Sequence, residues 1–253
     1  MNKKKIAGVI IATSLVLGGI VTSGVIKANA EKDKLADGTE IAAVLHQENP
    51  KSVADMDIQE IASNAISKYE DISKKNKKIK VELSNDLVED YDLVNDKELR
   101  KWIIRTKIDS SMAGVELSDQ GILNDSVKSM KKRNLAFKFA KENYNVKVNT
   151  ADVKKYILEE MEFYENDPNM GPFFTKLTSG LGIEKKEFYL EWEYDNFLNN
   201  FMWLQLRQKF EEKYPADLNE NQMDYTNKLI KAYNNELNAF IDAKGKVKSV
   251  KWD

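Results

Sequence analysis

Few residues of this sequence have the type and spacing that catalysis or metal binding requires. The single histidine, His46, stands beside Gln47 and Glu48, with no second histidine or cysteine to share a metal ion. The sequence contains no His-Glu-x-x-His, no Gly-x-Ser-x-Gly and no phosphate-binding glycine loop. Because cysteine is absent, disulfides, thiolate zinc sites and a cysteine nucleophile are excluded as well. We therefore expect no catalytic residue, no metal site and no cofactor, and we interpret His46 as an exposed side chain.

Two acidic segments could bind a cation or transfer protons, but each has a simpler interpretation. Asp167 begins the run Asp-Pro-Asn-Met-Gly, which lacks a third oxygen ligand before Gly171 and a glutamate six residues after it, as a calcium loop would need. Glu159, Glu160 and Glu162 could form a carboxylate pair for acid–base catalysis, yet they lie on an acidic helical stretch. We interpret the first segment as a turn and the second as a solvated helix surface.

The strongest compositional feature is aromatic. Residues 156–210 contain 13 of the chain's 24 Phe, Tyr and Trp. On the helix expected after Ile183, one stripe with 4-3-4-3 spacing consists of Leu190, Tyr194, Phe197, Phe201 and Leu204. The aromatic residues off this stripe are Phe188, Tyr189, Trp192, Trp203 and Phe210. Because a single covering surface cannot bury aromatics around most of a helix, this helix is either the centre of the core or one wall of an apolar groove.

If a groove exists, it should bind apolar segments of a polypeptide. The breaker cluster at 166–172 predicts a loop, and we expect Phe173 and Phe174 beside it to be accessible. Trp192 and Trp203 lie off the apolar stripe of the following helix. The candidate peptide-binding residues are therefore Phe173, Phe174, Trp192 and Trp203.

The N-terminus has the pattern of an export signal. Lysines at positions 3–5 precede an apolar run over residues 6–26, and Ala28 and Ala30 offer the small side chains that signal peptidase requires. Cleavage after Ala30 would make Glu31 the first residue of the mature chain. Alternatively, the run of 21 residues, about 30 Å long as a helix, stays as a membrane anchor. Both interpretations place the rest of the chain outside the cytoplasm, secreted or in the cell envelope, with membrane contact only through residues 6–26 if they are retained.

Composition and periodicity indicate a helical protein. Residues 31–253 contain only seven Gly and four Pro, which favours long helices, and their net charge of −6 argues against a nucleic-acid partner. Residues 31–53 are polar and are expected to form a flexible lead to a helical domain over 54–253. Apolar spacing predicts helices over 54–75, 96–108, 120–143 and 218–242, with two more beginning near Asn149 and Ile183. Alternation at 79–83 and 246–252 allows a minor two-stranded β element, and the acidic stretch at 89–92 is expected to be a loop.

The segment from Asn134 to Phe210 carries an ordered series of motifs. A helical Leu-Ala-Phe-Lys-Phe-Ala-Lys-Glu (135–142) leads to Val-Lys-Val (146–148), and the capped start Asn-Thr-Ala-Asp-Val (149–153) follows. After the loop come Phe174, Leu177, Leu-Gly-Ile (181–183), Glu-Phe (187–188) and Trp-Leu-Gln-Leu (203–206). This order resembles the N-terminal domain of the SurA/PrsA-type secretion foldases.

The resemblance implies an all-helical, trigger-factor-like fold whose crevice holds unfolded polypeptide in the export compartment and needs no catalytic residue. Members of that family often carry a parvulin-type prolyl-isomerase domain after the third helix. Here Phe210 is soon followed by the last helix, and the histidines of that domain are missing. The cysteine that anchors PrsA-type members through a lipid is missing too. Isomerase activity is therefore not expected.

We expect a mainly α, multi-helix fold and a chaperone or holdase for unfolded or partly folded secreted polypeptides. The alternative is a non-catalytic envelope or surface protein that binds one specific folded partner with the same helices.

Overall fold

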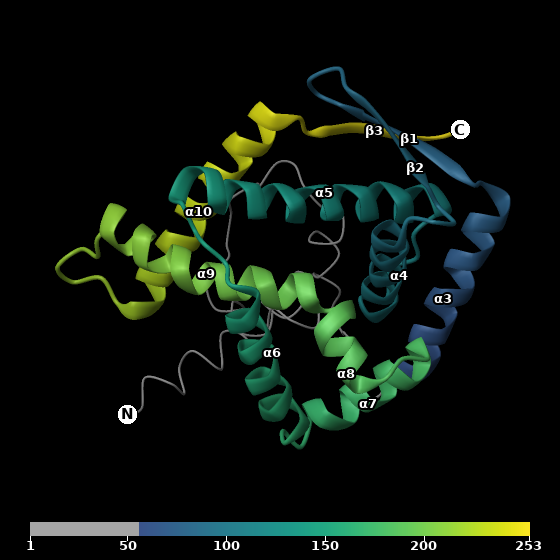
Figure 1. Cartoon of the computed structure of the whole chain (residues 1–253), viewed down its shortest axis with the longest axis horizontal. Coiled ribbons are helices and arrows are strands. Elements are labelled where there is room, and N and C mark those ends of the chain that lie inside the picture. The colour runs from purple at the N-terminus through teal and green to yellow at the C-terminus, as the bar shows by residue number, and fades with distance from the viewer. Residues whose placement is uncertain (1–55) are drawn as a thin grey trace.

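The structure, a computed structural model, describes residues 56–253, which form a mainly helical fold with one small sheet (Figure 1). The predicted fold class, mainly α with a minor β element, is confirmed. The elements follow one another as α3 (Ile58–Lys75), β1 (Lys78–Leu83), β2 (Val88–Asp92), α4 (Lys97–Met112), α5 (Asp119–Tyr144), α6 (Thr150–Glu165), α7 (Met170–Leu181), α8 (Lys185–Glu187), the π-helical turn η3 (Phe188–Trp192), α9 (Tyr194–Lys213), α10 (Gln222–Lys244) and β3 (Val247–Trp252).

Several predictions fall on the part of the chain before residue 56. The export segment at 1–30, its cleavage residues Ala28, Ala30 and Glu31, the lead at 31–53 and His46 all lie outside the described residues. They stay predictions. Within residues 56–253, no helix is both long and apolar enough to cross a membrane.

Side-chain caps set where the helices begin, because short polar side chains accept hydrogen bonds from first-turn N–H groups that have no partner in the helix. Asn149, the predicted cap, accepts from the backbone N–H of Ala151 at 2.9 Å, and α6 follows it. The same role is played at the starts of α3, α4, α5 and α10 by Asp57, Asp96, Ser118 and Asn221. At the other end of α10, Gly245 adopts a φ of +116° and ends the helix where the sequence predicted.

The sheet has three antiparallel strands in the order β2-β1-β3. The two alternating segments of the sequence do pair, with Val81 of β1 opposite Val250 of β3. The expected acidic loop at 89–92 is wrong, because these residues belong to β2, where Glu89 lies opposite Val81. β2 can be acidic because it is an edge strand, and Glu89 forms an ion pair with Lys131 of α5.

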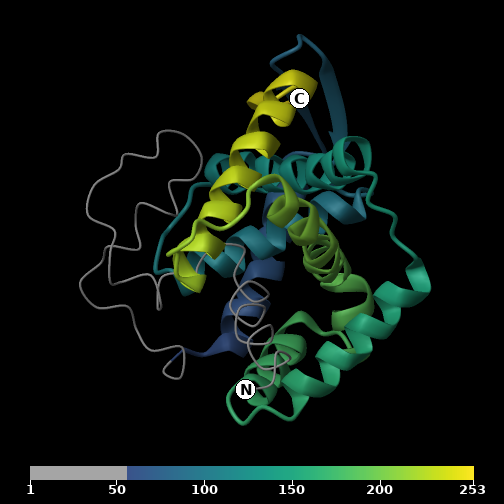
Figure 2. The same ribbon diagram turned by 90° about the vertical axis from the view of Figure 1, so that its left-hand side faces the viewer.

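Two clusters of buried side chains share the helices α5 and α9. The larger cluster joins α3, α4, α6, α7, η3 and the sheet to the first parts of α5 and α9. The smaller cluster lies where the later parts of α5 and α9 pack against α10, which crosses both helices on its way to the sheet (Figure 2). In the larger cluster α4 is the most fully covered helix, because its consecutive residues 102–106, which point to all sides of the helix, are buried.

Two helices far apart in the sequence, α3 and α7, lie side by side. Gly180 of α7 permits this approach, since a Cβ there would lie 2.3 Å from the carbonyl oxygen of Gln59 and 2.7 Å from the Cβ of Ala62. The hydroxyl of Ser63 donates a hydrogen bond to the carbonyl of Gly180 at 3.2 Å. The contact therefore fastens the beginning of the described chain to its middle.

The continuous helix expected after Ile183 is interrupted. A single turn, α8, passes into the π-helical turn η3, and the backbone bends at Glu193 before α9 begins. The π turn changes the phase only between Leu190 and α9, because Tyr194 and the later members of the predicted stripe all lie on α9. Leu204 is 43% exposed because the first part of α9 packs against the larger cluster, whereas its later part packs through another side against the smaller cluster. The core positions of α9 are filled by Phe197, Met202, Leu206 and Phe210.

Candidate functional site

The structure places Phe173 and Phe174 in helix α7 and buries them, with 8% and 3% of their surface exposed. The prediction that both are accessible beside a loop is therefore wrong. The loop is shorter than expected, because Asp167 accepts hydrogen bonds from the N–H groups of Asn169 and Met170 and α7 starts at once. The ring of Phe174 packs at 5.5–5.6 Å from the rings of Tyr164, Phe173, Phe188 and Tyr189. These two phenylalanines stabilise the core.

Trp192 and Trp203 are half-buried and lie in different parts of the molecule. Trp192 packs against the larger cluster, and its ring lies 5.9 Å from the guanidinium of Arg105. Trp203 packs against the smaller cluster, with its ring 5.1 Å from that of Tyr233. The structure therefore does not bring the four predicted peptide-binding residues together into one groove.

The acidic segments of α6 border a surface depression. Asp167 forms the predicted turn, and Glu159 and Glu162 are exposed as predicted, whereas Glu160 is half-buried. Beside them Phe163 is 53% exposed, which is unusual for so large an apolar side chain. The depression holds about 490 Å³ and is lined by Glu159, Glu162, Phe163, Asn166, Asp167 and Pro168.

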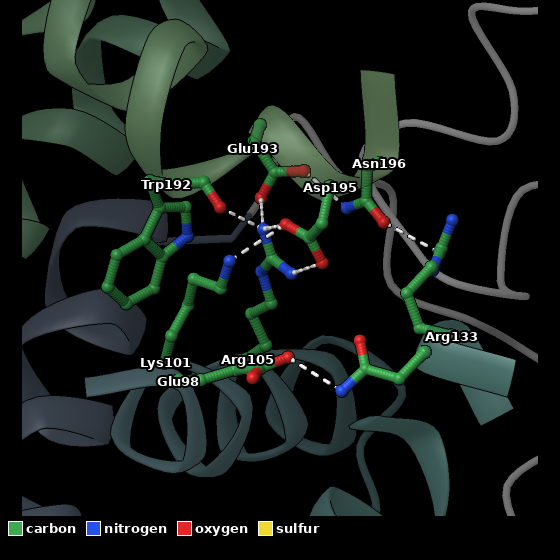
Figure 3. Close-up of polar contacts among 9 residues, drawn as sticks. Glu98, Lys101, Arg105, Arg133, Trp192, Glu193, Asp195 and Asn196 are labelled. Carbon is green, nitrogen blue, oxygen red and sulfur yellow. Dashed lines mark hydrogen bonds and ion pairs between the residues drawn. The ribbon is translucent and has the colours of Figure 1, made fainter. Parts of the chain in front are cut away.

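A second group of polar residues, which we call the Arg105 cluster, lies where α9 begins (Figure 3). Helix α4 contributes two cations four residues apart, and so on one face, while the bend before α9 and the first turn of α9 contribute the acids. The members of the cluster are Lys101, Arg105, Arg133, Trp192, Glu193, Asp195 and Asn196.

Arg105 is the centre of this cluster, and its guanidinium is almost completely buried. Its Nη1 lies 2.8 Å from Oδ2 of Asp195, and its Nη2 lies 3.0 Å from Oδ1 of the same carboxylate and 3.2 Å from Oε1 of Glu193. Nη2 also donates to the backbone carbonyl of Trp192. Lys101 donates to Asp195 at 2.8 Å, so two cations share one carboxylate. Such bidentate, charge-assisted bonds fix both distance and orientation.

A third cation comes from α5. Arg133 donates to the side-chain carbonyl of Asn196 at 2.7 Å, and the amide of Asn196 in turn donates to Glu193. Through these bonds α4, α5 and the start of α9 are joined (Figure 3).

Burial and charge pull the pKa values of these carboxyl groups apart. Loss of hydration raises the pKa of Glu193, against the attraction of Arg105. Loss of hydration and the nearby Glu193 raise the pKa of Asp109, one turn along α4 from Arg105, to about 7. For Asp195, loss of hydration is outweighed by Arg105 and Lys101, which hold its pKa well below the usual range. Asp109 therefore exchanges its proton near neutral pH, whereas Asp195 stays ionised.

Separated pKa values of this kind also occur in acid–base catalysis. The two depressions described in residues 56–253, the one at Phe163 and one of about 220 Å³ between α5 and β3, are lined by other residues. The bonds of Arg105 hold α4 and the start of α9 in one relative position, as buried ion pairs do in many folds.

One local signal for this cluster is present in the sequence. Arg105 directly follows the apolar segment Trp102-Ile103-Ile104, and a cation inside a buried helix must find an acidic partner. Which acid it would find could not be read from the sequence, because Glu193 and Asp195 lie about 90 residues away.

Among residues 56–253, no group of three or more His, Cys, Asp or Glu side chains is arranged to hold a metal ion. Comparison with known proteins gives no relationship: no family model, no curated protein and no solved structure matches this chain.

Proposed function

We propose that this chain is an extracytoplasmic, non-catalytic polypeptide-binding protein, a chaperone or holdase that shields apolar segments of unfolded or partly folded secreted polypeptides. The export pattern of the first 30 residues and the motif order at 134–210 support the compartment and the class. The observation that carries the proposal is the distribution of exposed apolar side chains over the molecule.

Most of the exposed large apolar side chains of residues 56–253 fall into three groups, and the elements that carry these groups lie at different ends of the molecule (Figure 1). The group on α6 consists of Leu158 and Phe163, the group around the start of α10 of Leu218, Met223 and Ile230, and the group around β2 of Leu87, Val88 and Val94. A folded partner needs one continuous surface of about 800 Å². Three separate apolar groups suit an extended polypeptide, which can contact more than one group at the same time.

The energetics of such binding are modest at each point. Burying one exposed Leu, Met or Phe side chain contributes about 1.5–3 kcal/mol before the cost of ordering the bound chain. Several points engaged together give a useful affinity, whereas one point alone gives a short-lived contact. This is the behaviour required of a protein that must hold and then release its substrate.

The depression at Phe163 adds a charge preference. Its other lining residues include Glu159, Glu162 and Asp167, and none of its lining residues is a lysine or arginine. A bound segment with an apolar residue next to a lysine or arginine would bury the apolar side chain on Phe163 and place the cationic group among these carboxylates.

The proposal is tested by the suppression of aggregation. The purified protein at severalfold molar excess should keep a chemically unfolded secreted protein from scattering light. Phe163→Ser combined with Leu218→Ser should weaken the suppression. The matched control is Leu204→Ser, which removes an exposed leucine outside the three groups and should have little effect. No suppression by the unaltered protein would refute the proposal.

Crosslinking in cells that export the protein separates the proposal from its alternative. A holdase should be linked to many unrelated secreted chains. One stoichiometric folded partner would favour the specific interaction protein instead.

A further inference from the structure

Strand β2 is an open edge of the sheet. In the order β2-β1-β3 it has a neighbour on one side, and no other strand of residues 56–253 pairs with its outer side. It is flanked by exposed apolar side chains, since Leu87 and Val88 are each 57% exposed at one end and Val94 is 54% exposed at the other.

The register shows which backbone groups of β2 point outward. Leu83 donates to the carbonyl of Leu87, and Leu93 donates to the carbonyl of Lys77, so the odd-numbered residues of β2 bond to β1. In an antiparallel pair the alternate residues direct their N–H and C=O groups away from the partner strand. These alternate residues are Val88, Asp90 and Asp92. The carbonyl of Asp92 accepts from Asp96, which leaves Val88 and Asp90 with both backbone groups turned outward.

The side chains of this edge are acidic, and they differ in how far they are already paired. Glu89 is paired with Lys131, and the carboxylate of Asp92 accepts hydrogen bonds within the turn that follows β2. Asp90 forms no ion pair or hydrogen bond with its side chain in the described residues, and it lies opposite Lys80 of β1. A cation arriving on the outer side would therefore meet a carboxylate without a cationic partner in the described residues, since the ammonium of Lys80 bonds to Asp253.

We propose that the outer edge of β2 binds an extended polypeptide segment as a fourth strand, and that the segment carries lysine or arginine at alternate positions. The backbone groups of Val88 and Asp90 would form hydrogen bonds with the backbone of the segment, and these bonds supply affinity, whereas the side chains supply specificity. Asp90 and the neighbouring Asp92 would favour basic residues on the same face. This inference rests on the proposed function, because it assigns one of the three apolar groups to a defined way of holding an unfolded chain.

Charge also argues against a second copy of this chain as the occupant. Pairing β2 with β2 would bring Glu89, Asp90 and Asp92 of two copies together, and like charges across a strand pair are destabilising. A basic client meets no such repulsion.

The test uses the purified full chain and two short peptides. One alternates lysine and valine, and the other has the same sequence with its lysine backbone nitrogens methylated. The first should bind, with an affinity that falls as salt rises, and the second should bind about tenfold more weakly or not at all. Equal binding of both peptides would overturn strand addition, since methylation leaves the side chains and charges in place.

Substitutions at Asp90 locate the site. Asp90→Pro removes an outward N–H without removing a bond to β1, and it should weaken binding of the unmethylated peptide about tenfold. Asp90→Asn keeps the N–H and removes the charge, so it should weaken binding only severalfold and reduce the dependence on salt. Unchanged binding by Asp90→Pro would refute the assignment to β2. If Asp90→Pro fails to fold, the comparison of the two peptides still decides whether the protein binds through hydrogen bonds to the peptide backbone.

Failure of the strand-addition proposal can be told apart from failure of the proposed function by comparing peptide binding with the aggregation assay. If strand addition is wrong but the proposed function is right, the protein suppresses aggregation and shows no preference between the two peptides. If the proposed function is wrong, suppression fails even where the peptide binds. Sedimentation of the protein alone should give a monomer at micromolar concentration, and a dimer lost in Asp90→Pro would make a second copy the occupant.

Discussion

The guanidinium of Arg105 on α4 reaches the bend before α9 and lies 3.2 Å from the carboxylate of Glu193. Its other hydrogen-bond partners, Asp195 and the carbonyl of Trp192, belong to the same short segment of the chain. The bend replaces a regular helical turn, so the backbone there lacks the support that a continuous helix would give. Arg105 supplies that support from a neighbouring helix.

Replacing Arg105 by methionine should therefore destabilise the fold strongly. The substitution keeps an unbranched chain about as long as the stem of arginine but leaves Glu193 and Asp195 buried without their main partner, which typically costs about 3–5 kcal/mol. Urea unfolding followed by circular dichroism measures the change. The matched control is Arg207→Met, which breaks a partly exposed pair with Glu211 within α9 and should cost under about 1 kcal/mol. Similar losses for both variants would contradict the role given to the buried pair.

Asp109 makes the stability depend on pH. Its pKa is about 7 in the fold against an ordinary value of 3.8, so the folded state binds its proton more tightly than the unfolded state. The resulting stabilisation is complete below about pH 4 and is lost as the pH rises to about 7. Asp109→Asn should raise the melting temperature at pH 8 and reduce its decline between pH 5 and pH 8.

Asp195 provides the contrast to Asp109. Its pKa is lowered in the fold, so its stabilisation is present above the ordinary value of 3.8 and is lost only at lower pH. Asp195→Asn should consequently lower the melting temperature at both pH 5 and pH 8. An Asp109→Asn variant that melts below the unaltered protein at pH 8 would show that the charged form of Asp109 stabilises the fold.

The helices were predictable wherever their signals are local. Asn149 and Gly245 mark a helix start and a helix end by their own chemistry, and the structure has both where the sequence predicted them. The pairing of the C-terminal strand with β1 was allowed by alternation alone. The strand at 88–92 was missed because its acidic side chains obscure the pattern, and the ion pair of Glu89 with Lys131 joins elements that the sequence does not connect.

The candidate site was less predictable because it depends on long-range packing. An aromatic-rich sequence has the same composition whether its rings fill a core or line a groove. Phe174 is buried because α6 and η3 surround it, and α7 is held in place through Gly180 against α3, which is more than 100 residues away. Similarly, the buried side of α9 changes between its first part and its later part, because each part packs against a different cluster, and the spacing of a single stripe cannot anticipate this.

The two kinds of phenylalanine in this region should separate stability from binding. Phe174→Ala removes a fully packed ring and should cost about 3–5 kcal/mol in the free energy of unfolding. Phe163→Ala removes an exposed ring and should cost under about 1 kcal/mol while weakening the suppression of aggregation. Urea unfolding and light scattering on the same preparations give both quantities. A Phe163→Ala variant that loses stability but keeps full suppression would assign this ring to the fold.

Gly180 should be the least replaceable small residue of the α3–α7 contact. A Cβ at this position would lie 2.3 Å from the carbonyl oxygen of Gln59, and because that atom belongs to the backbone, the two helices would have to move apart. Gly180→Ala should therefore cost about 3 kcal/mol, at the upper end of overpacking costs, despite the better helix propensity of alanine. The matched control is Gly121→Ala in α5, where the nearest atom, the hydroxyl oxygen of Ser118, is 3.4 Å away and stability should stay unchanged or rise by up to about 1 kcal/mol. Thermal unfolding of the two variants decides the matter, and a Gly180→Ala protein as stable as the control would mean that α3 and α7 do not pack as closely as described.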